Sequence, residues 1–179
     1  MAGSLVLIQE TTVSSSTATV SLVGIDSTFD VYKVVFNNVT FTTSSNTGFR
    51  ARVTVSGTAD TTSNYDRASK SLKSIGSFDD NSATDETSWD IANTSLDGTV
   101  TGSQANGILY CFNFNNSSEF SFITKESSNF DDRGAGTVTL NGSQGGAVHT
   151  VAQTCDGIQF FANTDNIAGG TFKLYGLKK

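Results

Sequence analysis

The feature that most constrains the fold is an alternation of apolar and polar residues that recurs over short stretches. It is clearest in Phe49–Val55, where Phe, Ala, Val and Val alternate with Arg, Arg and Thr. Residues two apart point to the same side of an extended chain, so this period predicts a strand with one buried face. The chain is therefore expected to be built from half-buried strands.

Similar segments follow one another along most of the chain. In Phe29–Val39, for example, Tyr32, Val34 and Phe36 share one side of the predicted strand. Further strands are predicted over Thr17–Val23, Gly107–Asn113 and Ala147–Ala152, around Phe120 and Phe122, and around Val138 and Leu140. Turn-forming residues separate them every 8–15 residues or so, which gives about nine or ten strands and favours a sandwich or barrel.

The last stretch of the chain also reads as strand. Ile158–Phe161 and Thr171–Tyr175 are rich in aromatic and β-branched residues, and a polar connector ending in Gly169-Gly170 joins them. Paired glycines permit the positive φ of a chain reversal, so we expect a hairpin here. Such an apolar ending must dock between earlier strands, as the closing element of a β-sandwich.

Composition narrows the classes of partner. The 179 residues suit a single domain over 1–179, and the formal net charge of −6 disfavours nucleic acid, whose phosphates need clustered Lys and Arg. No apolar run is long enough to cross a membrane. The first residues lack the basic and apolar regions of a signal peptide, so we expect synthesis and assembly in a cytoplasm.

The segment 60–99 departs from the alternation and is expected to be an irregular, loop-rich insertion. Its acidic residues Asp79, Asp80 and Asp85 could gather oxygen ligands around Ca²⁺, although their spacing matches no EF-hand. Acidic residues on loops are more often solvated turn formers, and we favour that alternative. Metal ligands are therefore a weak hypothesis here, and no cofactor is expected.

Two aromatic residues in the same segment allow two interpretations. Tyr65 and Trp89 could stack on a sugar ring if they were exposed. They could equally fill the edge of the sandwich under a loop, since aromatic side chains bury most of their area. We favour the core, and keep the glycan contact as the alternative.

Catalysis has little support in the sequence. His149 is the single histidine and stands in the apolar stretch AVHTVA, without a nucleophile elbow or reactive cysteine nearby. Cys111 and Cys155 lie far apart in sequence, form no CxxC pair and are expected to be free thiols. We therefore expect a protein that is not an enzyme.

The N-terminal segment suggests assembly instead. Leu5, Val6, Leu7 and Ile8 are apolar on both sides of a strand, which is typical of a strand covered on both faces or paired with another chain. We expect residues 1–10 to contribute an inter-subunit strand by β-addition, within a homo-oligomer.

Three segments, in order, resemble virion structural proteins of tailed bacteriophages, particularly marine and cyanobacterial ones. FDVYKVVFNNV is similar to a YD-x-Y-x-V-x-F-x-NV opening, FRARVTVSG with SNYDRA to an RVT-x-SG and YDYA passage, and IAGGTFKLYGLKK to a G-T-x-x-LYG-[IL]-K ending. At Asp66-Arg67-Ala68 this chain lacks the aromatic residue that the family often has third. The resemblance spans about Phe29 to Lys179.

The resemblance implies a jelly-roll-like antiparallel β-sandwich that serves as a virion component without catalysis. We expect a capsid decoration or cement protein on the head exterior, forming a homotrimer that contacts the major capsid protein or other virion proteins. The alternative is a tail-fibre or receptor-binding module that recognises a host cell-surface glycan. The chain has no heptad repeats for a trimeric stalk, which favours decoration.

Overall fold

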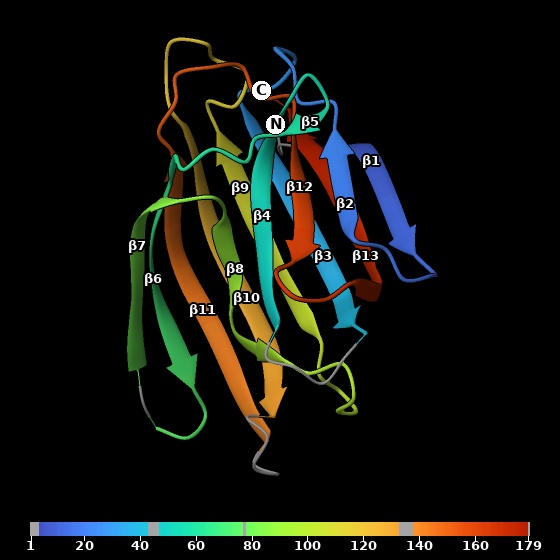
Figure 1. Ribbon diagram of the computed structural model, residues 1–179. Helices are drawn as coiled ribbons and strands as arrows, with labels where there is room; N and C mark the ends of the chain where they lie inside the picture. The colour runs from blue at the N-terminus through green and yellow to red at the C-terminus, as the bar shows by residue number, and fades with distance from the viewer. Residues whose placement is uncertain (1–3, 43–46, 77, 133–137, 179) are drawn as a thin grey trace.

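The computed structural model describes residues 4–42, 47–76, 78–132 and 138–178. This part of the chain contains strands and no helix, and the strands form two layers (Figure 1). The strands are β1 (Leu5–Val13), β2 (Thr19–Val23), β3 (Val31–Phe41), β4 (Thr47–Val55), β5 (Thr58–Ala59), β6 (Tyr65–Lys73), β7 (Phe78–Glu86), β8 (Trp89–Leu96), β9 (Ala105–Phe112), β10 (Ser121–Asp132), β11 (Val138–His149), β12 (Gly157–Ala162) and β13 (Ile167–Leu177).

The predicted all-β antiparallel sandwich is confirmed. An eight-stranded sheet has the order β1-β13-β3-β9-β10-β11-β6-β7, and a five-stranded sheet has the order β2-β12-β4-β5, with β8 also paired to β4. Within the sheets, the first strands of the chain pair with the last ones, β1 with β13 and β2 with β12. The two ends of the chain therefore lie side by side in both layers.

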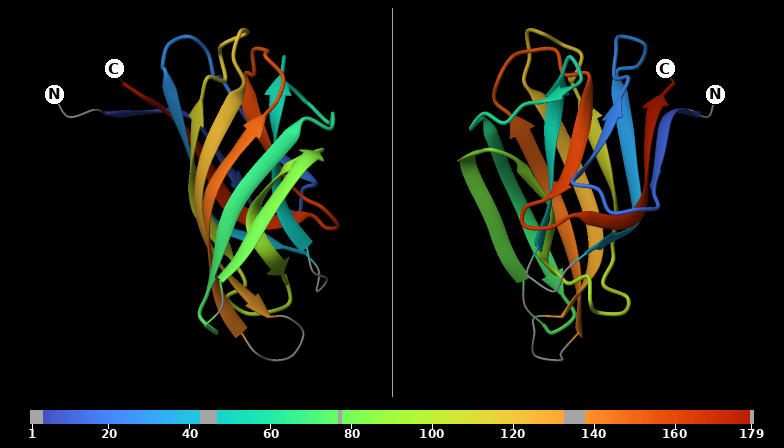
Figure 2. Two further views of the ribbon diagram at one scale, coloured as in Figure 1. Left: turned by 90° about the vertical axis from the view of Figure 1, so that its left-hand side faces the viewer. Right: turned by 45° about the vertical axis from the view of Figure 1, so that its right-hand side comes forward.

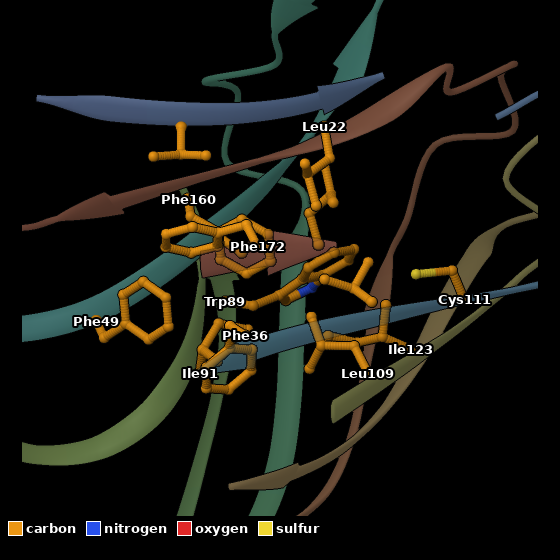
Figure 3. Packing of buried hydrophobic residues seen from close by; sticks show 14 of the residues in the cluster. Leu22, Phe36, Phe49, Trp89, Ile91, Leu109, Cys111, Ile123, Phe160 and Phe172 are labelled. Atoms are coloured by element: carbon orange, nitrogen blue, oxygen red, sulfur yellow. The ribbon is translucent and has the colours of Figure 1, made fainter. Parts of the chain in front are cut away.

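The core lies between the two sheets and is rich in aromatic rings (Figure 3). Phe49 and Phe160 stack with ring centroids 5.5 Å apart, and Phe172 from the opposite sheet lies 5.3 Å from Phe160. The inward positions predicted for the strand over Phe29–Val39 are correct, since Tyr32, Val34 and Phe36 are all buried. Alternation therefore identified the central strands of both sheets.

The predicted terminal hairpin is wrong, because β12 and β13 lie in different sheets. The prediction that both strands dock between earlier strands is correct. β12 lies between β2 and β4 in one sheet, and β13 lies between β1 and β3 in the other. Ile158 and Phe160 thus enter the core from one side, while Phe172 and Leu174 enter from the other. Two strands with one apolar face each can cover the same core from opposite layers, which alternation alone does not distinguish from a hairpin.

The expected irregular insertion over 60–99 is also corrected. It contains β6, β7 and β8, and β6 and β7 extend the eight-stranded sheet to its outer edge. β7 reads FDDNSATDE and has polar side chains on both sides, so it carries no alternation to detect. An edge strand of this kind is defended by its charges against pairing with other chains.

Candidate interaction face

The side of the eight-stranded sheet that turns away from the core, hereafter the outer face, is unusually apolar. Strand pairing aligns its outward residues in rows, because Tyr175 faces Lys33, and Lys33 faces Tyr110. Leu5, Leu7 and Phe122 on this face are 47%, 50% and 44% exposed. We call the following outward apolar residues of β1, β13, β3, β9 and the start of β10 the apolar band: Leu5, Leu7, Val31, Val35, Ile108, Tyr110, Phe112, Phe122, Tyr175 and Leu177.

β10 contributes to the outer face because the alternation over most of its length is reversed. Phe122 and Phe130 point outward, while Lys125, Ser127 and Asn129 point into the sandwich and are buried. The expectation that Phe120 and Phe122 mark a strand is right, but both rings are exposed. β9 is apolar on both sides, with Leu109 and Cys111 in the core. Strands that are apolar on both faces are normally covered on both faces.

Several hollows open on the outer face. The largest, of about 650 Å³, lies where the cross-strand neighbours Gly146, Ala68 and Ser82 have small side chains, between Phe122 and the edge strand β7. We call this hollow the trough. Three more lie beside Ile108 and Tyr110, with volumes of about 410, 390 and 220 Å³. The face thus combines projecting apolar side chains with recesses.

Several charged groups on the outer face have partners on the same face. Lys173 lies 3.4 Å from Glu10, and Lys70 lies 3.2 Å from Asp80. Lys33 stands over the ring of Tyr110, 5.4 Å from its centroid. Exposed pairs of this kind add little stability, but they leave the face close to neutral on a chain with a formal charge of −6.

The apolar segment Leu5–Ile8 forms the first half of β1. It pairs with β13 of its own chain, and the opposite edge of β1 is the edge of the eight-stranded sheet. The start of β1 and the end of β13 stand out together from the sandwich (Figure 2). Val6 is 39% exposed on the side opposite Leu5 and Leu7, while Ile8 packs against the core. Pairing of this edge with another chain stays a prediction.

The glycan contact suggested for Tyr65 and Trp89 is contradicted, because both side chains are fully buried. Their rings meet edge to face with centroids 5.2 Å apart. The Trp89 indole Nε1 donates a hydrogen bond to the Val148 carbonyl oxygen across the sheets, and the Tyr65 hydroxyl donates to the Asp60 carbonyl oxygen. The favoured alternative, a place in the core, is therefore correct.

The calcium hypothesis also fails on geometry. Asp79 and Asp80 lie at one end of the extended strand β7 and pair with Lys73 and Lys70. Asp85 lies at its other end, roughly 15–20 Å away at the usual rise of a strand. Among the described residues, no three His, Cys, Asp or Glu side chains gather as metal ligands would. Carboxylates this far apart cannot share one ion.

The buried ionisable groups belong to the interior of the sandwich. Burial lowers the pKa of Lys125 to about 8, partly offset by the charge of Asp90. Burial also lowers the pKa of His149, whose Nε2 lies 3.2 Å from Oδ2 of Asp60. Both cysteines are free and buried, and burial raises the pKa of Cys111 to about 12 and of Cys155 to about 11. These thiols are therefore protonated and unreactive at neutral pH.

Comparison with known proteins adds no relative. No family model matches the chain, and no curated protein or solved structure matches it. Within the described residues there is also no helix long and apolar enough to span a membrane.

Proposed function

We propose that this chain is a non-enzymatic structural protein of a bacteriophage virion, and that it decorates the capsid exterior as an oligomer, with a trimer as the expected state. The observation that carries the proposal is the apolar band on a chain with a formal charge of −6. Exposed apolar patches of this extent mark surfaces that bind other proteins. A protein with such a face is suited to permanent assembly.

The resemblance to phage virion proteins supports the virion setting. Its first segment overlaps β3, where the matching Tyr32, Val34 and Phe36 are buried. Its last segment overlaps β13, where the matching Leu174 is buried and the matching Tyr175 lies on the outer face. The matching residues thus lie both in the core and on the surface, and the decoration role is the step that needs testing.

Cryo-electron microscopy of the particle that carries this chain tests the proposal. The sandwich should appear at symmetry-related positions on the outside of the capsid shell, in contact with the major capsid protein or a neighbouring virion protein. Density restricted to the tail or its fibres would refute decoration. Absence of the chain from purified particles would refute the virion assignment altogether.

A tail-fibre or receptor-binding module is the second candidate, favoured by the exposed rings of the outer face. Phe122 is 44% exposed beside the trough, and Tyr110 lies beside two of the smaller hollows. Aromatic rings next to a recess can stack on a sugar. Binding of the purified chain to host surface glycans, lost in Phe122→Ala and Tyr110→Ala, would favour this candidate; no binding at millimolar glycan would exclude it.

A further inference from the structure

The outer face raises the question of what covers it. We infer that a second copy of this chain packs on the apolar band, so that the outer face of the eight-stranded sheet is a self-association interface. The inference rests on the proposed function only in treating this face as an assembly surface. It names the partner, and it can be tested on the isolated chain.

The area of the outer face fits a contact between two copies. The apolar band spans five neighbouring strands, from β1 to β10, and at most about five residues along each. At a strand spacing of about 4.8 Å it therefore covers roughly 400 Å² in projection. With the polar residues that flank the band on the same face, the area approaches the roughly 800 Å² that each partner contributes to a stable complex, which combines an apolar centre with a polar rim. The outer face is therefore large enough for a specific contact.

Charge also bears on the partner. A chain with a formal charge of −6 repels its own copies wherever unpaired carboxylates meet. On the outer face the carboxylates of Glu10 and Asp80 are paired with lysines of the same face. Glu126 accepts a hydrogen bond from the amide of Gln144, and Asp66 beside the trough accepts one from the Asp85 backbone amide. The two lysine pairs lower the repulsion between two copies that approach through this face.

The shape of the face suits a twofold contact. Such a contact uses the same surface on both copies, so a projection and a recess must occur on one surface, whereas a trimer would join two different surfaces. Here Leu5 and Leu7 project at one end of the face, and the trough lies toward the other end. A hollow of about 220 Å³ between Leu5 and Tyr110 offers a second recess. One face thus supplies both halves of an isologous contact.

The test is the molar mass of the full chain in solution, measured by size-exclusion chromatography with light scattering from about 1 to 100 μM. The chain alone has a mass of 18.8 kDa, and we expect a mass of two or more chains. Leu7→Lys and Phe122→Lys should weaken association at least 30-fold, which is the effect of losing a hot-spot residue. Ile75→Lys is the matched control, since Ile75 is 56% exposed in the β6–β7 turn, away from the apolar band.

A wild-type chain that stays at 18.8 kDa up to 100 μM would overturn the inference and leave the face to a different protein. So would an oligomer that both Lys variants leave intact. Should a Lys variant fail to show a cooperative thermal transition, hydroxyl-radical footprinting of the wild type decides. Oxidation of Tyr110 and Phe122 should fall as concentration rises, while that of Phe161 on the other sheet should not; equal oxidation at all concentrations would refute the contact.

Because these measurements use the isolated chain, they are independent of where the protein sits on a particle. Self-association with no place on the capsid would refute the proposed function and keep the interface. A capsid location with a monomeric chain would refute the interface and the proposed oligomeric state, and would keep the place on the capsid.

Discussion

Lys125 is a charged side chain buried in the sandwich. Its side chain is buried between the sheets, and Nζ donates a hydrogen bond of 2.7 Å to the Asp90 carbonyl oxygen. Burial lowers its pKa to about 8, against 10.5 in the unfolded chain. The unfolded state therefore holds more protons at this site between pH 8 and pH 10.5, so Lys125 opposes folding fully below pH 8 and progressively less above it.

We expect Lys125→Met to stabilise the fold by about 1–2 kcal/mol at pH 7, because a well-packed apolar side chain replaces a buried charge. The advantage over the wild type should shrink as pH rises from 8 to 10.5, measured by urea denaturation. Titration of the buried thiols Cys111 and Cys155 affects both proteins alike and cancels in the difference. Lys70→Met, at an exposed position, is the control, and an advantage independent of pH would contradict the assignment.

Two adjacent glycines of β11 should respond differently to a methyl group. A Cβ on Gly145 would lie 2.3 Å from the Ala68 carbonyl oxygen, so the backbone of β6 would have to move. A Cβ on Gly146 would lie 3.5 Å from the nearest atom, which is ordinary contact. Gly145→Ala should cost about 1–3 kcal/mol and Gly146→Ala less than about 0.5 kcal/mol, measured by thermal denaturation. Equal losses of stability in the two variants would contradict the close approach of β6 to β11 at Gly145.

At the scale of the strands, alternation predicted those that bury one apolar face and expose a polar one, such as β3 and β4. It failed for β7, which is polar on both sides, and for the orientation of β10, whose apolar residues face outward. A sequence pattern records which residues share a side, but not which side faces the core. Only the partner strands decide that.

Gln9 links β1 to the free edge of β2 in the opposite sheet. Its Oε1 accepts a hydrogen bond from the Val23 amide at 2.7 Å, and its Nε2 donates to the Ser21 carbonyl oxygen at 3.2 Å. Removing both bonds in Gln9→Ala should cost about 1–2 kcal/mol and lower the Tm by roughly 2–8 °C. Gln9→Glu keeps an acceptor for Val23 but loses the donor, so its Tm should fall between the two. An unchanged Tm in Gln9→Ala would show that the bridge does not stabilise the fold.

At the scale of the whole molecule, the two sheets differ in what they show to solvent. On the five-stranded sheet, Arg52 covers the ring of Phe161 at 4.0 Å, whereas the other sheet leaves its apolar band open. The sequence pointed to part of this site through Leu5–Ile8. It missed the rest because Tyr175, Val35 and Phe122 come together only through strand pairing.

The acid side of the stability profile provides a test of the buried interior as a whole. His149 is fully buried, against the Tyr65 ring and beside Asp60, and it is the single histidine of the chain. Burial lowers its pKa below 6.5, an effect that the nearby Asp60 carboxylate only partly offsets. The unfolded chain therefore binds the proton more readily, and stability should fall as pH drops below about 6.5.

Asp60 contributes in a lower pH range. Burial disfavours its charge, but hydrogen bonds from Thr62 and Gln153 outweigh this and lower its pKa below 3.8. The contribution of Asp60 to the free energy of unfolding is therefore constant above about pH 5 and is lost only in stronger acid. Between pH 5 and pH 6.5 the decline should come from His149. His149→Gln, which removes the titrating group, should flatten the urea-denaturation free energy over this window, whatever its cost at pH 7. A decline equally steep in both proteins would mean that the imidazole is not held neutral in the fold.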